Sequence, residues 1–333
     1  MLVVAAHPNQ DFHDAGDGHP ENPFRLRAAV AGFADAGIDG TSEWLPLRLA
    51  SRSELAAVHD VGYLDALAEL CAEGGGQLDP DTGVSAGSWE TAGATAGAGL
   101  GAMESLAAGR GDAAFVLGRP PGHHATRTRA MGFCLLNNVA VTAAALADRG
   151  ERVAIIDWDV HHGNGTQDIF WEDPRVLYVS IHQWPLYPGT GRPEERGAGA
   201  GVGTTVNMPM PPGATGDVYL AAFDEIVGPC VERFGATWVL VSAGFDAHRD
   251  DPLASMQLTA GDYADLTGRV MGLSGRAGRT ILFLEGGYDP GALRASVAAC
   301  ASRLIGQTYR PESSSSGGAG MARVADYRRV FFE

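Results

Sequence analysis

The feature that most constrains the fold is the alternation of short apolar runs with longer helical stretches. The runs are not interrupted by polar residues, which is typical of strands that are buried on both faces. They lie at Leu2–Ala6, Ala113–Leu117, Val153–Ile156, Val176–Ser180, Trp238–Ser242 and Thr280–Leu284. Helices are expected at Asn22–Ala36, Ser53–Ala72, Ser88–Ala108, Asn137–Arg149, Asp217–Phe234, Thr259–Gly272 and Pro290–Leu304. This order predicts an α/β fold, with a mostly parallel sheet that carries helices on both faces.

The chain has 333 residues, which is long enough to bury the core of one large domain. Its composition does not shift before residue 310 or so, and we therefore expect a single domain over residues 1–310. A flexible linker and a short tail are expected over residues 311–333, because the stretch ESSSSGGAG at residues 312–320 is rich in serine and glycine.

Charge and hydropathy exclude several classes of protein. The net charge of −16 argues against a general nucleic-acid binder, whose surface would be basic. No apolar run reaches the roughly 18 residues of a membrane helix, and Leu2–Ala6 is too short for a signal peptide. The four cysteines are scattered without a CxxC pair, so no disulfide framework is expected. These features predict a cytoplasmic protein.

Polar clusters follow four of the expected strands. They lie at Arg119–His124, Asp157–His162, Gly244–His248 and Glu285–Asp289. Because the carboxyl ends of parallel strands meet at one edge of a sheet, we expect the four clusters to converge on one pocket. Two of them contain adjacent histidines, which favours a catalytic site over scattered surface histidines.

One cluster has the composition of a metal site. Asp157, Asp159 and His161 alternate along the chain, so all three side chains can project the same way. A carboxylate beside an imidazole suits zinc or another divalent first-row ion. A catalytic site needs a third protein ligand, and Asp246 after another strand is the best candidate.

The remaining clusters supply groups for proton transfer. His123 and His124 follow a Pro-Pro-Gly turn and could act as a cationic stabiliser and a general base, provided that their pKa values differ. Asp157 would keep one imidazole charged, and Asn164 would leave the other free to exchange a proton. Tyr288 follows two glycines and is expected to donate to a developing oxyanion.

Several strings in the chain resemble the histone deacetylase family, in particular bacterial class II-type histone-deacetylase-like amidohydrolases. They are RPPGHHA, MGFCLLNN, DWDVHHGNGTQ, YVSIH, PGTG, SAGFDAHRDDPLA and EGGYD, and the similarity runs from about residue 7 to residue 304. The resemblance implies the arginase/deacetylase fold, a three-layer αβα domain with a central, mostly parallel sheet of eight strands.

The resemblance also implies two kinds of metal ion. A catalytic Zn²⁺ would be held by Asp159, His161 and Asp246, the ligand set that the residues themselves favour. A structural K⁺ behind the zinc would be held by oxygen atoms of Asp157, Asp159, His161, Ser180 and Ile181.

The catalytic roles follow from the family motifs. The resemblance implies that His124 is the general base and acid, and that His123 is its cationic partner, for which Asp157 is the candidate carboxylate. Tyr288 would donate to the substrate carbonyl. Asn164 stands where class I enzymes carry aspartate, and it matches the class II pattern.

The same motifs imply a narrow tunnel for the substrate. Gly132 and Phe133 match one wall, and Tyr187 stands where the family usually has phenylalanine at the other. Leu253, the residue after Pro252, would lie at the tunnel mouth. In the family a glutamate there accompanies polyamine specificity, and a leucine accompanies acyl-lysine substrates.

The expected function is zinc-dependent hydrolysis of an N-acylated primary amine, with an acetylated lysine peptide favoured as substrate. An acetylated polyamine or another small acetylated amine from biosynthesis stays open. A two-manganese ureohydrolase is disfavoured, because it needs a further aspartate where this chain has His248. A non-catalytic acyl-lysine-binding module is disfavoured because every catalytic motif is retained. The sequence leaves open whether the chain forms a homo-oligomer.

Overall fold

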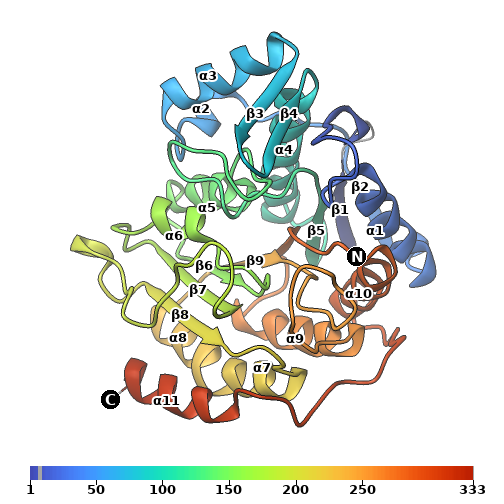
Figure 1. Cartoon of the computed structure of the whole chain (residues 1–333). Coiled ribbons are helices and arrows are strands. Elements are labelled where there is room, and N and C mark those ends of the chain that lie inside the picture. The colour runs from blue at the N-terminus through green and yellow to red at the C-terminus, as the bar shows by residue number, and fades with distance from the viewer. Residues whose placement is uncertain (7–9, 333) are drawn as a thin grey trace.

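The protein is described by a computed structural model that covers residues 1–6 and 10–332. Within those residues, a parallel sheet of eight strands forms the centre, in the order β2-β1-β5-β10-β9-β6-β7-β8 (Figure 1). The strands are β1 Leu2–Ala6, β2 Ser42–Trp44, β5 Ala113–Leu117, β6 Val153–Asp157, β7 Val176–Gln183, β8 Thr205–Met210, β9 Trp238–Ala243 and β10 Thr280–Leu284. Every strand predicted from an apolar run is therefore confirmed.

The helices and remaining elements complete the chain. The α-helices are α1 Pro23–Asp35, α2 Arg52–Leu55, α3 Val61–Ala72, α4 Ser88–Ala107, α5 Asn138–Ala147, α6 Asn164–Ile169, α7 Gly216–Ala222, α8 Gly228–Phe234, α9 Ala260–Leu273, α10 Pro290–Leu304 and α11 Met321–Phe332. The short turns are η1 Gln10–Phe12, η2 Asp39–Thr41, η3 Gly199–Gly201 and the π-helical turn η4 Phe223–Val227. A separate antiparallel hairpin consists of β3 Gly75–Asp79 and β4 Thr82–Ser85.

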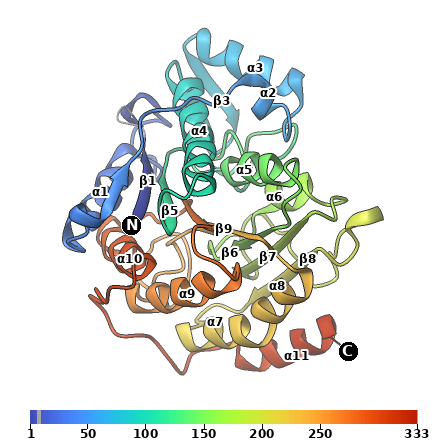
Figure 2. The same ribbon diagram turned by 180° about the vertical axis from the view of Figure 1, so that it is seen from behind.

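The segment after α10 crosses the outside of α9 and α7 and ends in α11 (Figure 2). Ser315 donates from both its backbone N–H and its hydroxyl to Asp262 of α9, and Thr259 donates to the carbonyl of Ser313. Tyr327 of α11 is buried against the domain. The serine-rich stretch is thus held by hydrogen bonds in the structure, whereas the domain boundary at residue 310 stays a prediction.

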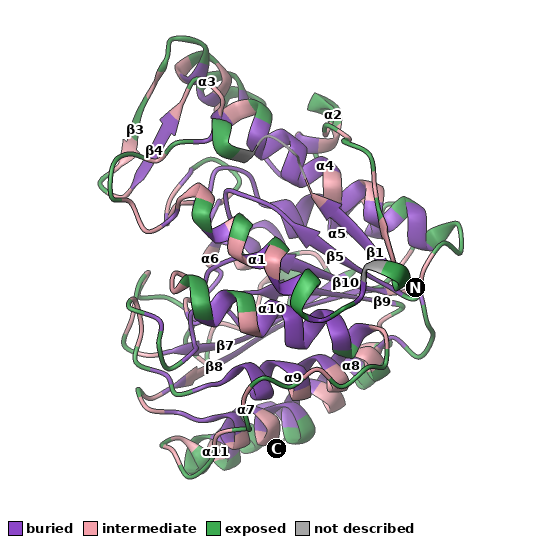
Figure 3. Cartoon of the chain, turned by 90° about the vertical axis from the view of Figure 1, so that its right-hand side faces the viewer, coloured by how far each residue is buried: buried purple, intermediate pink, exposed green. Residues whose placement is uncertain are grey.

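Side chains of the strands alternate between two apolar cores, one on each face of the sheet. Val4 and Phe115 pack with α1 and with α7 to α11, whereas Val3 and Val116 pack with α3, α4 and α5. Viewed along the sheet, the molecule therefore has three layers (Figure 3). The strands have continuous apolar sequences because both of their faces are buried.

Two predicted helices differ from the structure in detail, and two strands of the central sheet were not predicted from the apolar runs. The helix expected over Ser53–Ala72 is split into α2 and α3, because the carboxylate of Asp60 accepts the first N–H groups of α3 and starts a new helix there. The stretch Asp217–Phe234 is interrupted by η4. The apolar runs did not reveal β2 or β8, whose sequences SEW and TVNMPM mix polar and apolar residues.

Candidate active site

The four polar clusters meet at one edge of the sheet. They follow β5, β6, β9 and β10, which are neighbours in the order β5-β10-β9-β6. His123, Asp157, Asp246 and Glu285 are all buried at the carboxyl ends of these strands. The convergence that the sequence predicted is therefore present.

Asp159, His161 and Asp246 form a compact group that could hold a metal ion. One potential ligand atom of each residue lies within 4.8 Å of the others. The Nδ1 atom of His161 lies 3.2 Å from Oδ1 of Asp159 and 3.1 Å from Oδ2 of Asp246. Both carboxylates are buried and the His161 side chain is 12% exposed, so the group is almost completely enclosed by protein.

The chemistry of this group fits a divalent cation. Backbone N–H groups fix the carboxylates: Gly286 donates to Oδ2 of Asp159 at 2.8 Å, and Val160 donates to Oδ1 of Asp246 at 2.9 Å. Burial alone would lower the pKa of His161, but its hydrogen bonds with Asp159 and Asp246 raise it to about 10. Two buried carboxylates beside one imidazole thus attract positive charge, as a metal site requires.

Glycine is needed next to these carboxylates. A Cβ atom on Gly286 would lie 2.0 Å from Oδ2 of Asp246, and one on Gly244 would lie 2.1 Å from Oδ2 of Asp159. The glycines in SAGFD and EGGYD therefore allow the backbone to pack directly against the metal-site carboxylates.

The two adjacent histidines have different partners. Nδ1 of His123 donates to Oδ2 of Asp157 at 3.0 Å, and Nδ1 of His124 donates to Oδ1 of Asn164 at 2.8 Å. Burial opposes charge on both imidazoles. The negative charges of Asp159 and Asp157 nevertheless raise the pKa of His123 to about 10. Burial and the neighbouring imidazoles hold the pKa of His124 well below its usual value. The pair is therefore arranged as one charged and one neutral imidazole.

Two supports of this pair were not predicted from the sequence. The carboxylate of Glu285 accepts hydrogen bonds from the backbone N–H groups of Gly122 at 2.6 Å and His123 at 3.2 Å. The hydroxyl of Tyr178 donates to Oδ2 of Asp157 at 3.1 Å. A carboxylate directly after an apolar strand, as Glu285 follows β10, was the signal that could have revealed the first support.

Tyr288 lies between an aromatic wall and an arginine. Its ring makes an edge-on contact with Phe133, with the ring centroids 5.7 Å apart. The guanidinium of Arg25 lies 4.7 Å from the centroid of the Tyr288 ring and donates to the carbonyls of Gly287 at 2.7 Å and Glu285 at 2.5 Å. The turn that carries Tyr288 is thus fixed from α1, which sequence reasoning did not anticipate.

A buried ion network anchors that arginine. Glu21 accepts two hydrogen bonds from Arg119, both at 2.7 Å, and one from Arg25 at 3.3 Å. Burial alone would raise the pKa of Glu21, but His13 and the guanidinium of Arg119 lower it well below its usual range. Glu21 is therefore a permanent carboxylate that joins α1 to the strand end preceding the histidine pair.

The expected tunnel residues also adjoin the histidines. Gly132 and Phe133 have positive φ angles of 56° and 68°, and a Cβ atom on Gly132 would lie 2.5 Å from Cδ2 of His124. The ring of Tyr187 packs edge-on against His124, with the centroids 5.2 Å apart. Leu253 is partly exposed in the loop that follows β9. Gly132 and Tyr187 therefore lie beside His124, and Phe133 lies beside Tyr288, whereas the tunnel itself and the place of Leu253 at its mouth stay predictions.

The residues expected to hold potassium lie on adjacent strands. Asp157 of β6 pairs in register with Ser180 of β7, and Ile181 follows on the same strand. The hydroxyl of Ser180 is hydrogen-bonded to Nδ1 of His182 at 2.9 Å. The potassium site itself stays a prediction.

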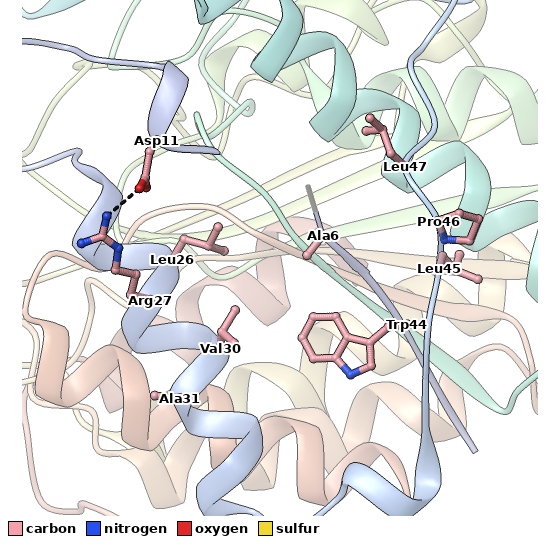
Figure 4. A pocket seen from close by; sticks show the side chains of 10 residues that line it. All are labelled: Ala6, Asp11, Leu26, Arg27, Val30, Ala31, Trp44, Leu45, Pro46 and Leu47. Carbon is pink, nitrogen blue, oxygen red and sulfur yellow. Dashed lines mark hydrogen bonds and ion pairs between the residues drawn. The ribbon is translucent and has the colours of Figure 1, made fainter. Parts of the chain in front are cut away.

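A large apolar groove lies away from this site. It has a volume of about 680 Å³ and runs between α1 and the segment that follows β2 (Figure 4). Leu26, Val30 and Trp44 line it, and an ion pair between Arg27 and Asp11 lies at its border. Apart from Asp11 and Arg27, the described residues that line it are apolar, and none belongs to the strand-end cluster, so we place the chemistry at that cluster and not here.

Comparison with known proteins decides the family. A sequence profile described as "Histone deacetylase domain" matches residues 19–304. The chain belongs to the histone deacetylase family. As a member of this family, it is an amidohydrolase, and its three-layer structure is the arginase/deacetylase fold.

This member of the histone deacetylase family is also similar to individual deacetylases and to a solved structure. It is 41% identical over 291 residues to a "Probable deacetylase" of Archaeoglobus fulgidus, a match that covers 86% of this chain and 81% of that protein. It is 40% identical over 280 residues to a "Histone deacetylase-like amidohydrolase" of Pseudomonas aeruginosa, covering 83% and 74% of the two chains. The crystal structure of the HDA15 HD domain superposes with a TM-score of 0.91 at 35% identity, covering 99% of this chain and 94% of that one.

Other predictions concern the protein outside its site. None of the helices in residues 1–6 and 10–332 has both the length and the apolar character needed to cross a membrane. The cytoplasmic location, the lack of nucleic-acid binding and the oligomeric state stay predictions.

Proposed function

We propose that the protein is a zinc-dependent deacetylase of N-acetylated primary amines, and that its preferred substrate is ε-acetyl-lysine in peptides. The proposal rests on one observation: the group formed by Asp159, His161 and Asp246 lies beside the histidine pair. In that pair His123 is charged and His124 is neutral. When bound by Asp159, His161 and Asp246, Zn²⁺ supplies Lewis acidity towards the acyl carbonyl and makes water a stronger nucleophile.

The protein's own residues divide the proton transfers between them. Because Nδ1 of His124 is engaged by Asn164, its Nε2 takes the proton of the attacking water and later returns it to the leaving amine. His123 stays protonated beside Asp157 and stabilises negative charge in the site. The hydroxyl of Tyr288 donates to the oxygen that becomes negative as the amide carbonyl is attacked.

The walls of the passage favour a long, slender acyl-amine. Phe133 and Tyr187 offer ring faces and edges to an aliphatic stem, as the methylene chain of lysine requires. At the mouth, Leu253 provides apolar surface and no carboxylate to hold a second ammonium group. This supports an acetyl-lysine peptide over an acetylated polyamine, which is the second candidate.

We expect the wild-type enzyme to have a higher kcat/KM for acetyl-lysine peptides than for acetylputrescine or acetylspermidine. Leu253→Glu should narrow or invert this preference, more strongly at low salt. A carboxylate about 4 Å from a substrate ammonium contributes up to 4 kcal/mol, roughly, at an effective dielectric constant near 20, and less where water screens it. Steady-state kinetics on the zinc-loaded wild type and variant measure the ratio of kcat/KM for the acetyl-lysine peptide to kcat/KM for each acetylated polyamine.

Leu253→Gln is the matched control, because it has the size and polarity of the glutamate variant without its charge. It should leave the preference between the two substrate classes close to that of the wild type. A wild type that already prefers acetylated polyamines, or an unchanged ratio in Leu253→Glu, would overturn the peptide assignment.

A further inference from the structure

The loop between β9 and α9 supports two parts of the proposed site through one carboxylate. Oδ1 of Asp251 accepts the backbone N–H of Leu253 at 3.0 Å. Oδ2 accepts the backbone N–H groups of Tyr288 at 2.6 Å and Asp289 at 3.4 Å. Asp251 is buried, so it holds the mouth residue and the tyrosine turn in a fixed relation.

A buried histidine holds this loop in shape. The carbonyl of His248 accepts the backbone N–H of Asp251 at 2.9 Å, and its Nδ1 accepts the backbone N–H of Asp250 at 3.2 Å. Because Nδ1 is an acceptor, the ring proton lies on Nε2. That Nε2 therefore donates to Oε2 of Glu312, at 2.8 Å.

Glu312 connects both ends of the loop. Besides the bond from His248, its carboxylate accepts a hydrogen bond from the guanidinium of Arg249 at 2.5 Å. It also accepts one from the backbone N–H of Ala260, the first residue of α9, at 2.8 Å. Glu312 belongs to the segment that follows α10, which lies far from this loop in sequence. Backbone hydrogen bonds from Arg249 to Leu258 and from Leu258 to Ala247 also join the two ends of the loop, and the Glu312 carboxylate adds a side-chain link from outside the predicted catalytic domain.

The segment that carries Glu312 is itself fixed. We call residues 312–318 the C-terminal strap. The hydroxyl of Ser315 donates to Asp262 at 2.6 Å and accepts the N–H of Gly216 at 2.8 Å, and the N–H of Gly318 donates to Thr215 at 2.8 Å. The strap is therefore attached to α7 and α9 independently of Glu312, and it can hold the carboxylate in place.

We propose that Glu312 is a positioning residue that acts on Tyr288 through His248 and Asp251. Removing its carboxylate leaves the buried Nε2–H of His248 without its protein acceptor and removes the side-chain link between the two ends of the loop, which loosens the loop. Asp251 then no longer fixes the backbone of Tyr288, and the hydroxyl loses its alignment with the substrate carbonyl. This inference rests on the proposed deacetylase function.

A double-mutant cycle on the zinc-loaded full chain tests the inference. Glu312→Ala should lower kcat for an acetyl-lysine peptide about 10-fold and change KM less than about 2-fold, because small displacements of a catalytic group act on the chemical step. In a Tyr288→Phe background, where the hydroxyl is already absent, the same change should cost less than about 2-fold. A general loss of structure would give the same factor in both backgrounds.

Hydrogen exchange gives a readout that does not depend on activity. The backbone amides of residues 285–290 and 248–254 should exchange faster in Glu312→Ala than in the wild type. Ser315→Ala is the matched control, because it removes an anchor of the strap that does not touch the loop. It should lower the melting temperature, but because Glu312 keeps its own partners, kcat and the exchange of these two segments should change far less than in Glu312→Ala.

A second variant covers the case in which Glu312→Ala does not fold. Glu312→Asp keeps the charge but retracts the carboxylate by one methylene, and it should show the same dependence on Tyr288 with a loss of about 3-fold. The inference would be overturned if the loss of kcat were equal in the wild-type and Tyr288→Phe backgrounds. It would also be overturned if the amide exchange rates of residues 285–290 did not change. Inactivity of the wild type on every acetylated amine would instead overturn the proposed function, and the exchange experiment would still decide the role of Glu312.

Discussion

Asp246→Ala should abolish both tight zinc binding and amide hydrolysis. Asp159 and His161 alone cannot hold the ion in an open tetrahedral site, which needs three protein ligands. Zinc per chain, measured by elemental analysis after dialysis, and turnover of an acetyl-lysine peptide test this together. Circular dichroism should show that the variant stays folded.

Asp250→Ala is the control for this experiment. It removes an exposed carboxylate from the same loop, with 63% of its side chain accessible, and should keep both zinc and activity. Full zinc occupancy with normal turnover in Asp246→Ala would contradict the ligand assignment.

Tyr288→Phe should lower kcat by roughly 10²–10³ with a modest change in substrate affinity, because one donor to the developing oxyanion is lost. His124→Ala should cost at least as much, since both proton transfers depend on its imidazole. Single-turnover measurements of acetate release separate these losses from effects on binding or product release.

His123→Ala provides the comparison that tests the division of roles. Its imidazole contacts Asp157 and is the charged member of the pair. If its loss were far more damaging than that of His124, the base and the electrostatic partner would have to be exchanged.

The fold could be predicted from the sequence where burial is complete. Strands such as β5 and β6 are covered on both faces and have continuous apolar sequences, so their positions are evident. β2 and β8 are the two edge strands of the sheet. Their sequences contain polar residues, and β8 also contains a proline, so neither forms a continuous apolar run that could be recognised as a strand. Only the family resemblance implied a sheet of eight strands, and it did not locate β2 or β8 in the chain.

The candidate site could be predicted where its residues are close in sequence or end a strand. The pairing of His123 with Asp157, and of His124 with Asn164, agrees with the sequence prediction. The supporting contacts could not be predicted, because tertiary packing sets them between distant segments. Arg25, for example, contacts Gly287, 262 residues further along the chain.

We propose above that one zinc ion, held at the strand-end cluster, makes this chain a deacetylase. The most direct test removes metal from the purified protein with a chelator and adds Zn²⁺ back in steps while acetate release from an acetyl-lysine peptide is measured. Activity should be lost on chelation and should return in proportion to the zinc added, reaching its maximum at one ion per chain. Full activity without metal, or activity that requires two manganese ions per chain, would contradict it.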